Sequence, residues 1–352
     1  MKNKSKVKLW IGVVLSVIVT VVSLNYVIDP LWVFSHSNAL NNKQPVFNER
    51  QQKTNKLYFG LATGETQKYD SLMIGSSRGA MFDQNDFDGM KLFNYSANNM
   101  EPWEYSGWIE VAKKIKGSDF KNIVIALDFF SAQNKAGEVT NPEELPESYL
   151  QRAQEKLYPY RSLLSLDTAN NAFKGLMKAV RSPGVEYYNR QNVKVATQVS
   201  AEQRDQYIQW NIEDHQKDFG ENYRYNTDWV NLLETLKTQN PTTNFIILTT
   251  PVSKIWFDEF VNPKHLDDYK RWLKETVGVF GKVHHFMYMN SVTKNVDNFF
   301  DAHHVYQRVT QMMAKKVSMD ARDSNKTLLD DFGLVLTPKS IKAYLAGLKV
   351  TR

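Results

Sequence analysis

Cysteine is absent from this chain of 352 residues. Its absence excludes disulfide bonds, a thiolate nucleophile and any cysteine-ligated metal site, and it leaves the redox compartment open. The chain also has little excess of positive charge outside its amino terminus, because Lys2, Lys4, Lys6 and Lys8 supply four of the six net positive units. No basic stripe with interleaved aromatic residues follows, so the composition does not predict nucleic-acid binding. The chain also contains no internal repeat and no low-complexity tract.

Charged residues are missing from one long stretch, residues 9–28. As a helix this stretch is about 30 Å long, which matches the core of a bilayer. The lysines before it favour a cytoplasmic amino terminus, and no small-x-small cleavage site follows it. The sequence therefore predicts a basic tail and uncleaved single-pass anchor over residues 1–30, a polar linker over 31–56, and an extracytoplasmic domain attached to the cell membrane.

Five short apolar runs after the linker predict parallel β-strands, and helical patterns lie between them. The expected strands are residues 70–75, 92–95, 122–127, 245–249 and 283–289. Helices are expected over 103–116, 229–237 and 305–319. The gap between the third and fourth strands is too long for one crossover, so residues 135–235 are expected to be a helical insertion, forming either a lid or groove or a structural side layer. The predicted body covers residues 57–320, followed by an extension over 321–352 with a helix from residue 338.

Two serines follow the first predicted strand, in the turn Gly75-Ser76-Ser77. The carboxyl ends of parallel strands are where open α/β sheets place their ligands, so a hydroxyl there is positioned to act as a nucleophile. The same pattern also occurs in proteins without a catalytic serine.

A second motif, Asp301 and His304 with Ala302 and His303 between them, follows the last predicted strand. A serine nucleophile needs a histidine that takes its proton and a carboxylate that orients the histidine, and this spacing can deliver both. The alternative is that Asp301 caps the next helix and His304 fills the turn. A metal site is not expected, because His284 and His285 would point to opposite faces of a strand and no HExxH motif is present.

The two motifs together resemble the SGNH (GDSL-like) hydrolase family. The resemblance implies a three-layer α/β/α fold with a five-stranded parallel sheet. It maps the family's Gly-Asp-Ser block onto Gly75-Ser76-Ser77, which makes Ser77 the nucleophile, His304 the base and Asp301 its orienting carboxylate.

The family's oxyanion residues are not found at their usual places. Asn94 to Asn99 contain no glycine, and Asp128-Phe129-Phe130 stands where the family has Gly-x-Asn-Asp. Ser96, Asn98 or Asn99 are the substitutes that the sequence offers. Arg78 is a candidate contact for an anionic substrate or, alternatively, half of a surface salt bridge, whereas Asp128 either lines the site or caps a helix.

These departures, together with the anchor, resemble one branch of the family: the membrane-anchored alginate and peptidoglycan O-acetyltransferases and the D-alanyl transfer protein of teichoic acids. The resemblance, over about residues 10–320, implies an acyl-Ser77 intermediate that is passed to a cell-envelope polysaccharide, with no cofactor. It also implies a multispanning membrane O-acyltransferase as donor. The alternatives are an esterase that uses the same three residues and a non-catalytic polysaccharide-binding subunit, in which Trp103, Trp108, Trp256 or Tyr288 would stack on sugars.

Overall fold

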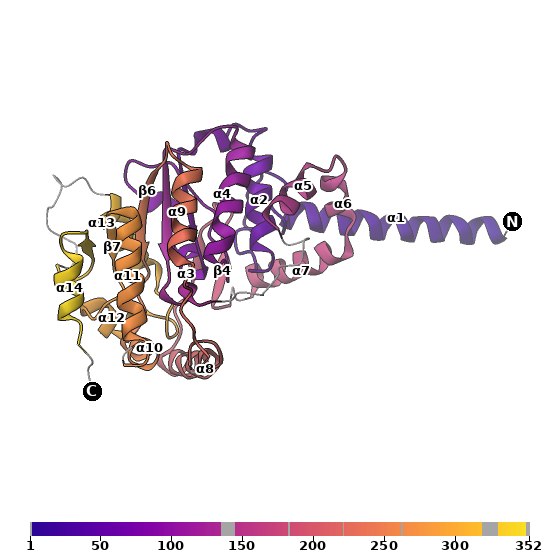
Figure 1. Cartoon of the computed structure of the whole chain (residues 1–352). Helices are drawn as coiled ribbons and strands as arrows, with labels where there is room; N and C mark the ends of the chain where they lie inside the picture. The colour runs from indigo at the N-terminus through magenta and orange to yellow at the C-terminus, as the bar shows by residue number, and fades with distance from the viewer. Residues whose placement is uncertain are drawn as a thin grey trace.

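The computed structural model describes residues 2–134, 145–181, 184–220, 222–261, 263–318 and 330–349. One long helix, α1 (Lys2–Ile28), projects from an α/β body (Figure 1). Residues 4–28 of α1 are long and apolar enough to cross a membrane, and little of this surface is buried by the rest of the protein.

A six-stranded sheet with the order β2-β1-β3-β6-β7-β8 forms the centre of the body. The first five strands in this order are parallel, and β8 pairs antiparallel with β7. The strands are β1 (Ser71–Gly75), β2 (Leu92–Asn94), β3 (Asn122–Leu127), β6 (Asn244–Thr249), β7 (Val283–His285) and β8 (Leu334–Leu336). All five predicted strands are therefore present and parallel, but the prediction of a five-stranded sheet is wrong by one strand.

Two details of the sheet differ from the prediction for identifiable reasons. The sixth strand, β8, has only three residues, too few to give a periodic pattern in the sequence. The fifth strand ends at His285 rather than at residue 289, because the backbone N–H groups of Phe286 and Met287 donate to the Thr249 hydroxyl instead of to a neighbouring strand.

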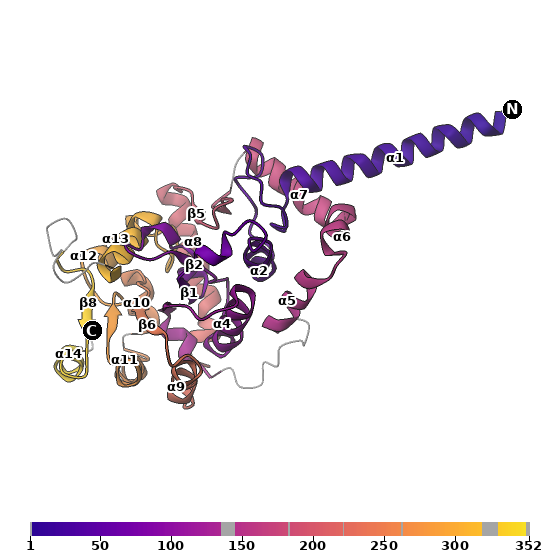
Figure 2. The ribbon, with the colours of Figure 1, turned by 90° about the horizontal axis from the view of Figure 1, so that it is seen from above.

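The central strands are buried on both faces, as parallel strands usually are. Alternate side chains of β3 enter two different apolar clusters. Ile123 and Ile125 lie in the first cluster, and Val124 lies in the second. The first cluster includes residues of α4 (Pro102–Lys116), α9 (Trp229–Gln239) and α11 (Leu266–Phe280), and the second includes residues of α13 (Gln307–Ser318). Figure 2 shows these helices on opposite sides of the sheet.

The predicted insertion contains helices, as expected, and also a small antiparallel sheet. Its elements are α5 (Pro146–Gln154), α6 (Tyr158–Leu164), α7 (Leu166–Val180), β4 (Glu186–Tyr188), β5 (Lys194–Ala196) and α8 (Ala201–Phe219). Helices α6 and α7 lie beside the end of α1, whereas α8 lies beside α10 (Lys254–Phe260) (Figure 1). Residues 135–144, 182–183 and 221 of the insertion lie outside the described residues.

The polar stretch before the body is not the linker that its composition suggested. Residues 49–59 form α2 (Glu49–Phe59), a helix with a mostly buried surface. Its polar side chains are buried because they bond backbone groups: Gln52 donates to the Pro30 carbonyl and Asn55 to the Leu31 carbonyl. The folded body therefore begins before residue 57. At the other end, the predicted helix after residue 338 is α14 (Ile341–Gly347).

Candidate active site

Ser77 stands at the first position of the short helix α3 (Ser77–Ala80), with only Ser76 between it and β1. Small residues allow this sharp turn: a Cβ on Gly75 would lie 2.9 Å from the Ala126 Cβ, and one on Gly79 would lie 2.7 Å from the Ser96 hydroxyl. The parallel strands run in the order of the doubly wound flavodoxin-like sheet, in which ligands bind where the strand order reverses, between the first and third strands. Ser77 follows the first of these two strands.

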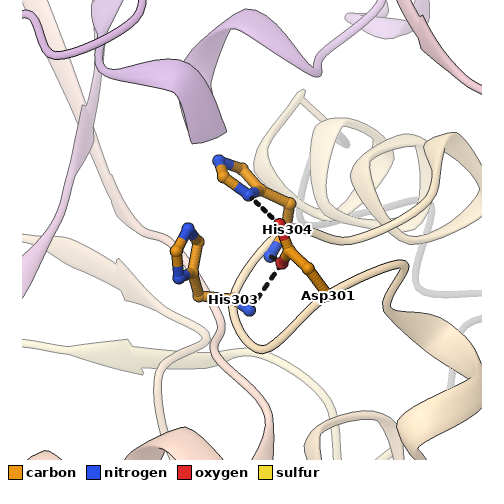
Figure 3. A group of neighbouring side chains, drawn as sticks. All are labelled: Asp301, His303 and His304. Carbon is orange, nitrogen blue, oxygen red and sulfur yellow. Dashed lines mark hydrogen bonds and ion pairs between the residues drawn. The ribbon is translucent and has the colours of Figure 1, made fainter. Parts of the chain in front are cut away.

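The structure brings together the three residues that the two motifs named. Ser77 Oγ lies 2.8 Å from His304 Nε2, and His304 Nδ1 lies 2.7 Å from Asp301 Oδ2. Asp301 Oδ1 accepts two further hydrogen bonds, from the backbone N–H groups of His303 at 2.8 Å and His304 at 2.7 Å (Figure 3). Asp301 therefore orients the imidazole so that Nδ1 carries a proton and Nε2 faces the serine hydroxyl. This is the arrangement by which a histidine removes a proton from a serine nucleophile.

The carboxylate is suited to remain ionised in this setting. Burial raises the pKa of Asp301, but the His304 ring and the two backbone N–H donors lower it by more, so the net pKa lies below its ordinary value. At neutral pH a negative Asp301 can stabilise the imidazolium that forms when His304 accepts a proton.

Beside Ser77 and His304, Arg78 and Asp128 form a buried ion pair, with 3.2 Å between Nη1 and Oδ2. Arg78 also donates from Nε to the His303 carbonyl at 3.2 Å, and its guanidinium lies 3.9 Å from the centre of the Phe130 ring. Burial lowers the pKa of Arg78, and the opposing charge of Asp128 limits this effect. The expected alternative of a surface salt bridge is wrong, because both partners are buried.

Asp128, whose role the sequence left open, lines the site; it also precedes the short 3-10 helix η3 (Phe129–Ala132), but its side chain makes no capping hydrogen bond there. Its carboxylate accepts hydrogen bonds from the hydroxyls of Ser76 and Thr250. Ser76 in turn caps α3 by accepting from the Arg78 backbone N–H. The network therefore assigns Ser76 to the framework of the turn, and Ser77 is the serine whose hydroxyl contacts the histidine.

Ser77 lines a cleft with a volume of about 530 Å³. Most of its lining is polar, and helix α8 of the insertion supplies one wall through Asp214, His215 and Asp218. Trp103, at the start of α4, is 41% exposed and lies at the same cleft. Trp108 and Trp256, two of the predicted sugar-stacking residues, are instead buried in the core.

A cleft of similar size, about 550 Å³, lies beside Trp32 and Lys56, near the start of β2. His36 lines it, but this ring contacts the Tyr26 carbonyl at 2.7 Å and the Asn41 amide at 3.2 Å. Its histidine is therefore tied to the framework, and the cleft at Ser77 is the better candidate for chemistry.

The four predicted oxyanion or substrate residues separate into two groups. Asn99 and Arg78 line the cleft with Ser77. Ser96 is buried beneath α3 near Gly79, and Asn98 points elsewhere, because its side chain accepts a hydrogen bond from Lys194 and its backbone N–H donates to Glu49. Asn99 has a φ of 51°, a left-handed conformation that asparagine tolerates better than most residues.

Two histidines at the cleft were missed as site residues by sequence reasoning. The rings of His303 and His215 stack at 4.6 Å, and Trp256 Nε1 donates to His215 Nδ1 at 2.8 Å. Burial, with Arg78 and His304 nearby, lowers the pKa of His215 to about 4, and burial lowers that of His303 well below its ordinary value. Both rings are therefore neutral at neutral pH. His303 stands inside the predicted motif, but His215 comes from the insertion, where its sequence gave no signal.

Asp301, His303 and His304 also offer one ligand atom each within 4.8 Å of one another, a spacing that could hold a metal ion. In this structure Asp301 and His304 bond each other, and the second nitrogen of His304 faces Ser77. His284 and His285, the other close pair, lie on β7, where His285 bonds Thr249 at 2.9 Å.

Comparison of the chain with protein-family models and with curated proteins finds no match. The arrangement of Ser77, His304 and Asp301 must therefore support any functional assignment by its own chemistry.

Proposed function

We propose that the protein is a serine-dependent acyltransferase, which carries an acyl group, most simply acetyl, on Ser77 and passes it to a hydroxyl of a cell-envelope polysaccharide. The hydrogen-bonded chain from Ser77 through His304 to Asp301, open to a cleft, is the observation that carries the proposal. Three residues from two distant parts of the chain meet in the geometry that nucleophilic catalysis needs.

The reaction has two halves. His304 Nε2 takes the proton of Ser77 Oγ as this oxygen attacks the acyl carbonyl of the donor, and His304 then gives the proton to the leaving group. In the second half, His304 takes a proton from the acceptor hydroxyl as its oxygen attacks the acyl-Ser77 ester, and His304 then returns this proton to Ser77 Oγ as the ester bond to the serine breaks. Asp301 holds the imidazole in the required tautomer in both halves. Asn99 and Arg78 are the candidates to face the oxyanion, because both line the cleft.

The strand order supports a relation to the SGNH family with its three-layer α/β/α fold, which places a catalytic serine after the first strand and an Asp-x-x-His motif after the last parallel strand. In this proposal α1 anchors the protein in the cell membrane, with the amino terminus in the cytoplasm and the body outside. A multispanning membrane O-acyltransferase would then supply the acyl group from the membrane side. The exposed Trp103 at the cleft suits a sugar acceptor, since aromatic faces pack on sugar rings.

An esterase that removes acyl groups from envelope polymers is the second candidate, because the same three residues serve when water replaces the sugar hydroxyl. The two differ in the acceptor of the acyl group. The bonded triad argues against the third expectation, a non-catalytic polysaccharide-binding subunit.

The test is the intact mass of the full chain in detergent after incubation with p-nitrophenyl acetate. We expect one acetyl adduct, absent from Ser77→Ala and strongly reduced in His304→Ala. Ser131→Ala is the matched control, since Ser131 lines the same cleft and should leave the adduct intact. An adduct that persists in Ser77→Ala would exclude Ser77 as the nucleophile. Added oligosaccharide then separates the two candidates, because a transferase yields acetylated sugar and an esterase yields only acetate.

A further inference from the structure

The helices α6 and α7 carry an apolar face that no part of the described chain covers. Leu166, Phe173 and Val180 are 73%, 55% and 67% exposed. They are spaced seven residues apart, so they form one stripe along α7. Leu157, Tyr160 and Leu164, just before and within α6, are also exposed. Six large apolar side chains are thus exposed within 24 residues, and a concentration of this kind is typical of protein or membrane interaction sites.

The opposite side of α7 packs against the base of α1. Thr168, Ala172 and Gly175 are the buried residues of α7, and a Cβ on Gly175 would lie 3.1 Å from the Ile28 side chain. The apolar stripe therefore faces away from the body while the helix lies beside α1. Figures 1 and 2 both show α6 and α7 next to the end of α1 that joins the body.

The position of this contact along α1 determines its depth in a membrane. The uncharged run of residues 9–28 is about 30 Å long as a helix, just enough to cross a bilayer core. Packing with the body begins only at about Val21. If the membrane ended there, about 12 residues, or roughly 18 Å, would remain to cross it, which is too short. When the bilayer covers the whole run, the junction between α6 and α7 lies at the level of the lipid.

At this junction the backbone carbonyls where α6 ends have a side-chain donor, which lipid could not provide. Asn25 Nδ2, on α1, lies 3.2, 2.8 and 3.0 Å from the carbonyls of Ser162, Leu163 and Ser165, where α6 ends. The Ser165 hydroxyl accepts from the Thr168 backbone N–H and so caps α7. A buried asparagine in an otherwise apolar helix thus meets the backbone groups that lipid could not satisfy.

From these observations we infer that the face formed by Leu157, Tyr160, Leu164, Leu166, Phe173 and Val180 inserts into the lipid of the leaflet beside the body. The inference rests on α1 crossing the membrane, which is part of the proposed function, and adds a second membrane contact that fixes how the body is held. Lys174 and Arg181, exposed next to the stripe, suit the anionic headgroups at the rim of such a contact. α7 has a single acidic residue, Asp167, in its first turn.

The absence of native cysteine makes the test direct. Single cysteines replace Leu166 or Phe173 in the full chain and are labelled with an environment-sensitive fluorophore after reconstitution into phospholipid vesicles. Val17→Cys on α1 is the control for lipid burial, and Trp210→Cys, an exposed apolar residue of α8, is the control for an exposed apolar site. We expect quenching by lipids with spin labels in their acyl chains at residues 17, 166 and 173, and quenching by aqueous iodide at residue 210.

Lipid quenching at residue 17 with iodide quenching at residues 166 and 173 would overturn the inference and leave α1 as the sole anchor. Because pure lipid vesicles contain no other protein, that result would exclude lipid as the cover of this face and leave a membrane-protein partner as its occupant. Iodide quenching at all positions would overturn both this inference and the membrane crossing by α1. The acetyl adduct on Ser77, measured on the same labelled proteins, tests the catalytic proposal separately.

Discussion

Arg78 and Asp128 form a buried ion pair beside the turn that carries Ser77. We expect each charge of this pair to be tolerated in the interior only because the other neutralises it. At 3.2 Å and an effective dielectric constant near 20, the attraction between two unit charges is about 5 kcal/mol. Removing both charges from water costs several kcal/mol per ion, so the pair adds little net stability over an apolar pair of the same size. Removing only one partner leaves the other charge buried and unpaired, which costs about 3–5 kcal/mol.

We therefore expect Asp128→Asn and Arg78→Met each to lower the free energy of unfolding by about 3–5 kcal/mol. The double variant should lose at least 2 kcal/mol less than the sum of the two single losses, because no unpaired charge remains. Asparagine keeps an oxygen that can accept from Ser76 and Thr250, so the substitution changes mainly the charge.

The assay is urea unfolding of the full chain in a mild detergent, followed by tryptophan fluorescence, as a double-mutant cycle. Arg271 and Glu275 provide a matched control, since this pair lies 2.7 Å apart in a helix with Arg271 44% exposed. Its coupling should be about 0.3–0.5 kcal/mol. A coupling for Arg78 and Asp128 as small as that of the control would refute the argument that each charge needs the other.

Two further results are expected. Asp301→Asn should slow acetylation of Ser77 by about 10⁴-fold with little effect on folding, because the amide no longer favours the His304 tautomer with a proton on Nδ1. Rapid-quench mass spectrometry measures the rate, and an unchanged rate would exclude Asp301 as the residue that orients His304. Burial lowers the pKa of Lys53 to about 7, so between about pH 7 and 10 the unfolded chain holds the extra proton and stability rises with pH, by about 2 kcal/mol from pH 7 to 9. Burial also lowers the pKa of Lys56 to about 8, so Lys56 adds a rise of its own. In urea titrations at the two pH values, Lys53→Met should therefore lose about 2 kcal/mol of the total rise, whereas Lys114→Met, at an exposed site, should keep all of it.

The sequence predicted the parts of the fold in which local pattern and burial agree. β1, β3 and β6 are continuous apolar runs because both faces of a central parallel strand are covered, and all three lie where they were expected. Ser77 and His304 are 227 positions apart, yet both follow strands of one parallel sheet, so topology alone predicted that they lie near the same edge.

The parts that were missed depend on contacts between distant segments. The polar residues of α2 gave no apolar stripe, since they are buried through hydrogen bonds to the Pro30 and Leu31 carbonyls rather than through apolar packing. Arg78 looked like a surface residue because its partner, Asp128, lies 50 positions away at the end of another strand. Asp128 did carry a signal, its place directly after β3, whereas nothing near His215 indicated that α8 would form a wall of the cleft.

The insertion links the two proposals. Tyr149 on α5 lines the cleft at Ser77, and α6, which carries part of the proposed lipid-contacting face, begins only four residues after α5 ends. His215 on α8 lines the same cleft. If α6 and α7 contact lipid, the end of the cleft formed by α5 is the end nearest the membrane, and the wall formed by α8 lies farther from the membrane (Figure 1). An acyl donor delivered from the membrane would then enter the cleft beside α5, and a polymer acceptor would approach along α8. The donor and the acceptor would therefore reach Ser77 from different sides of the cleft.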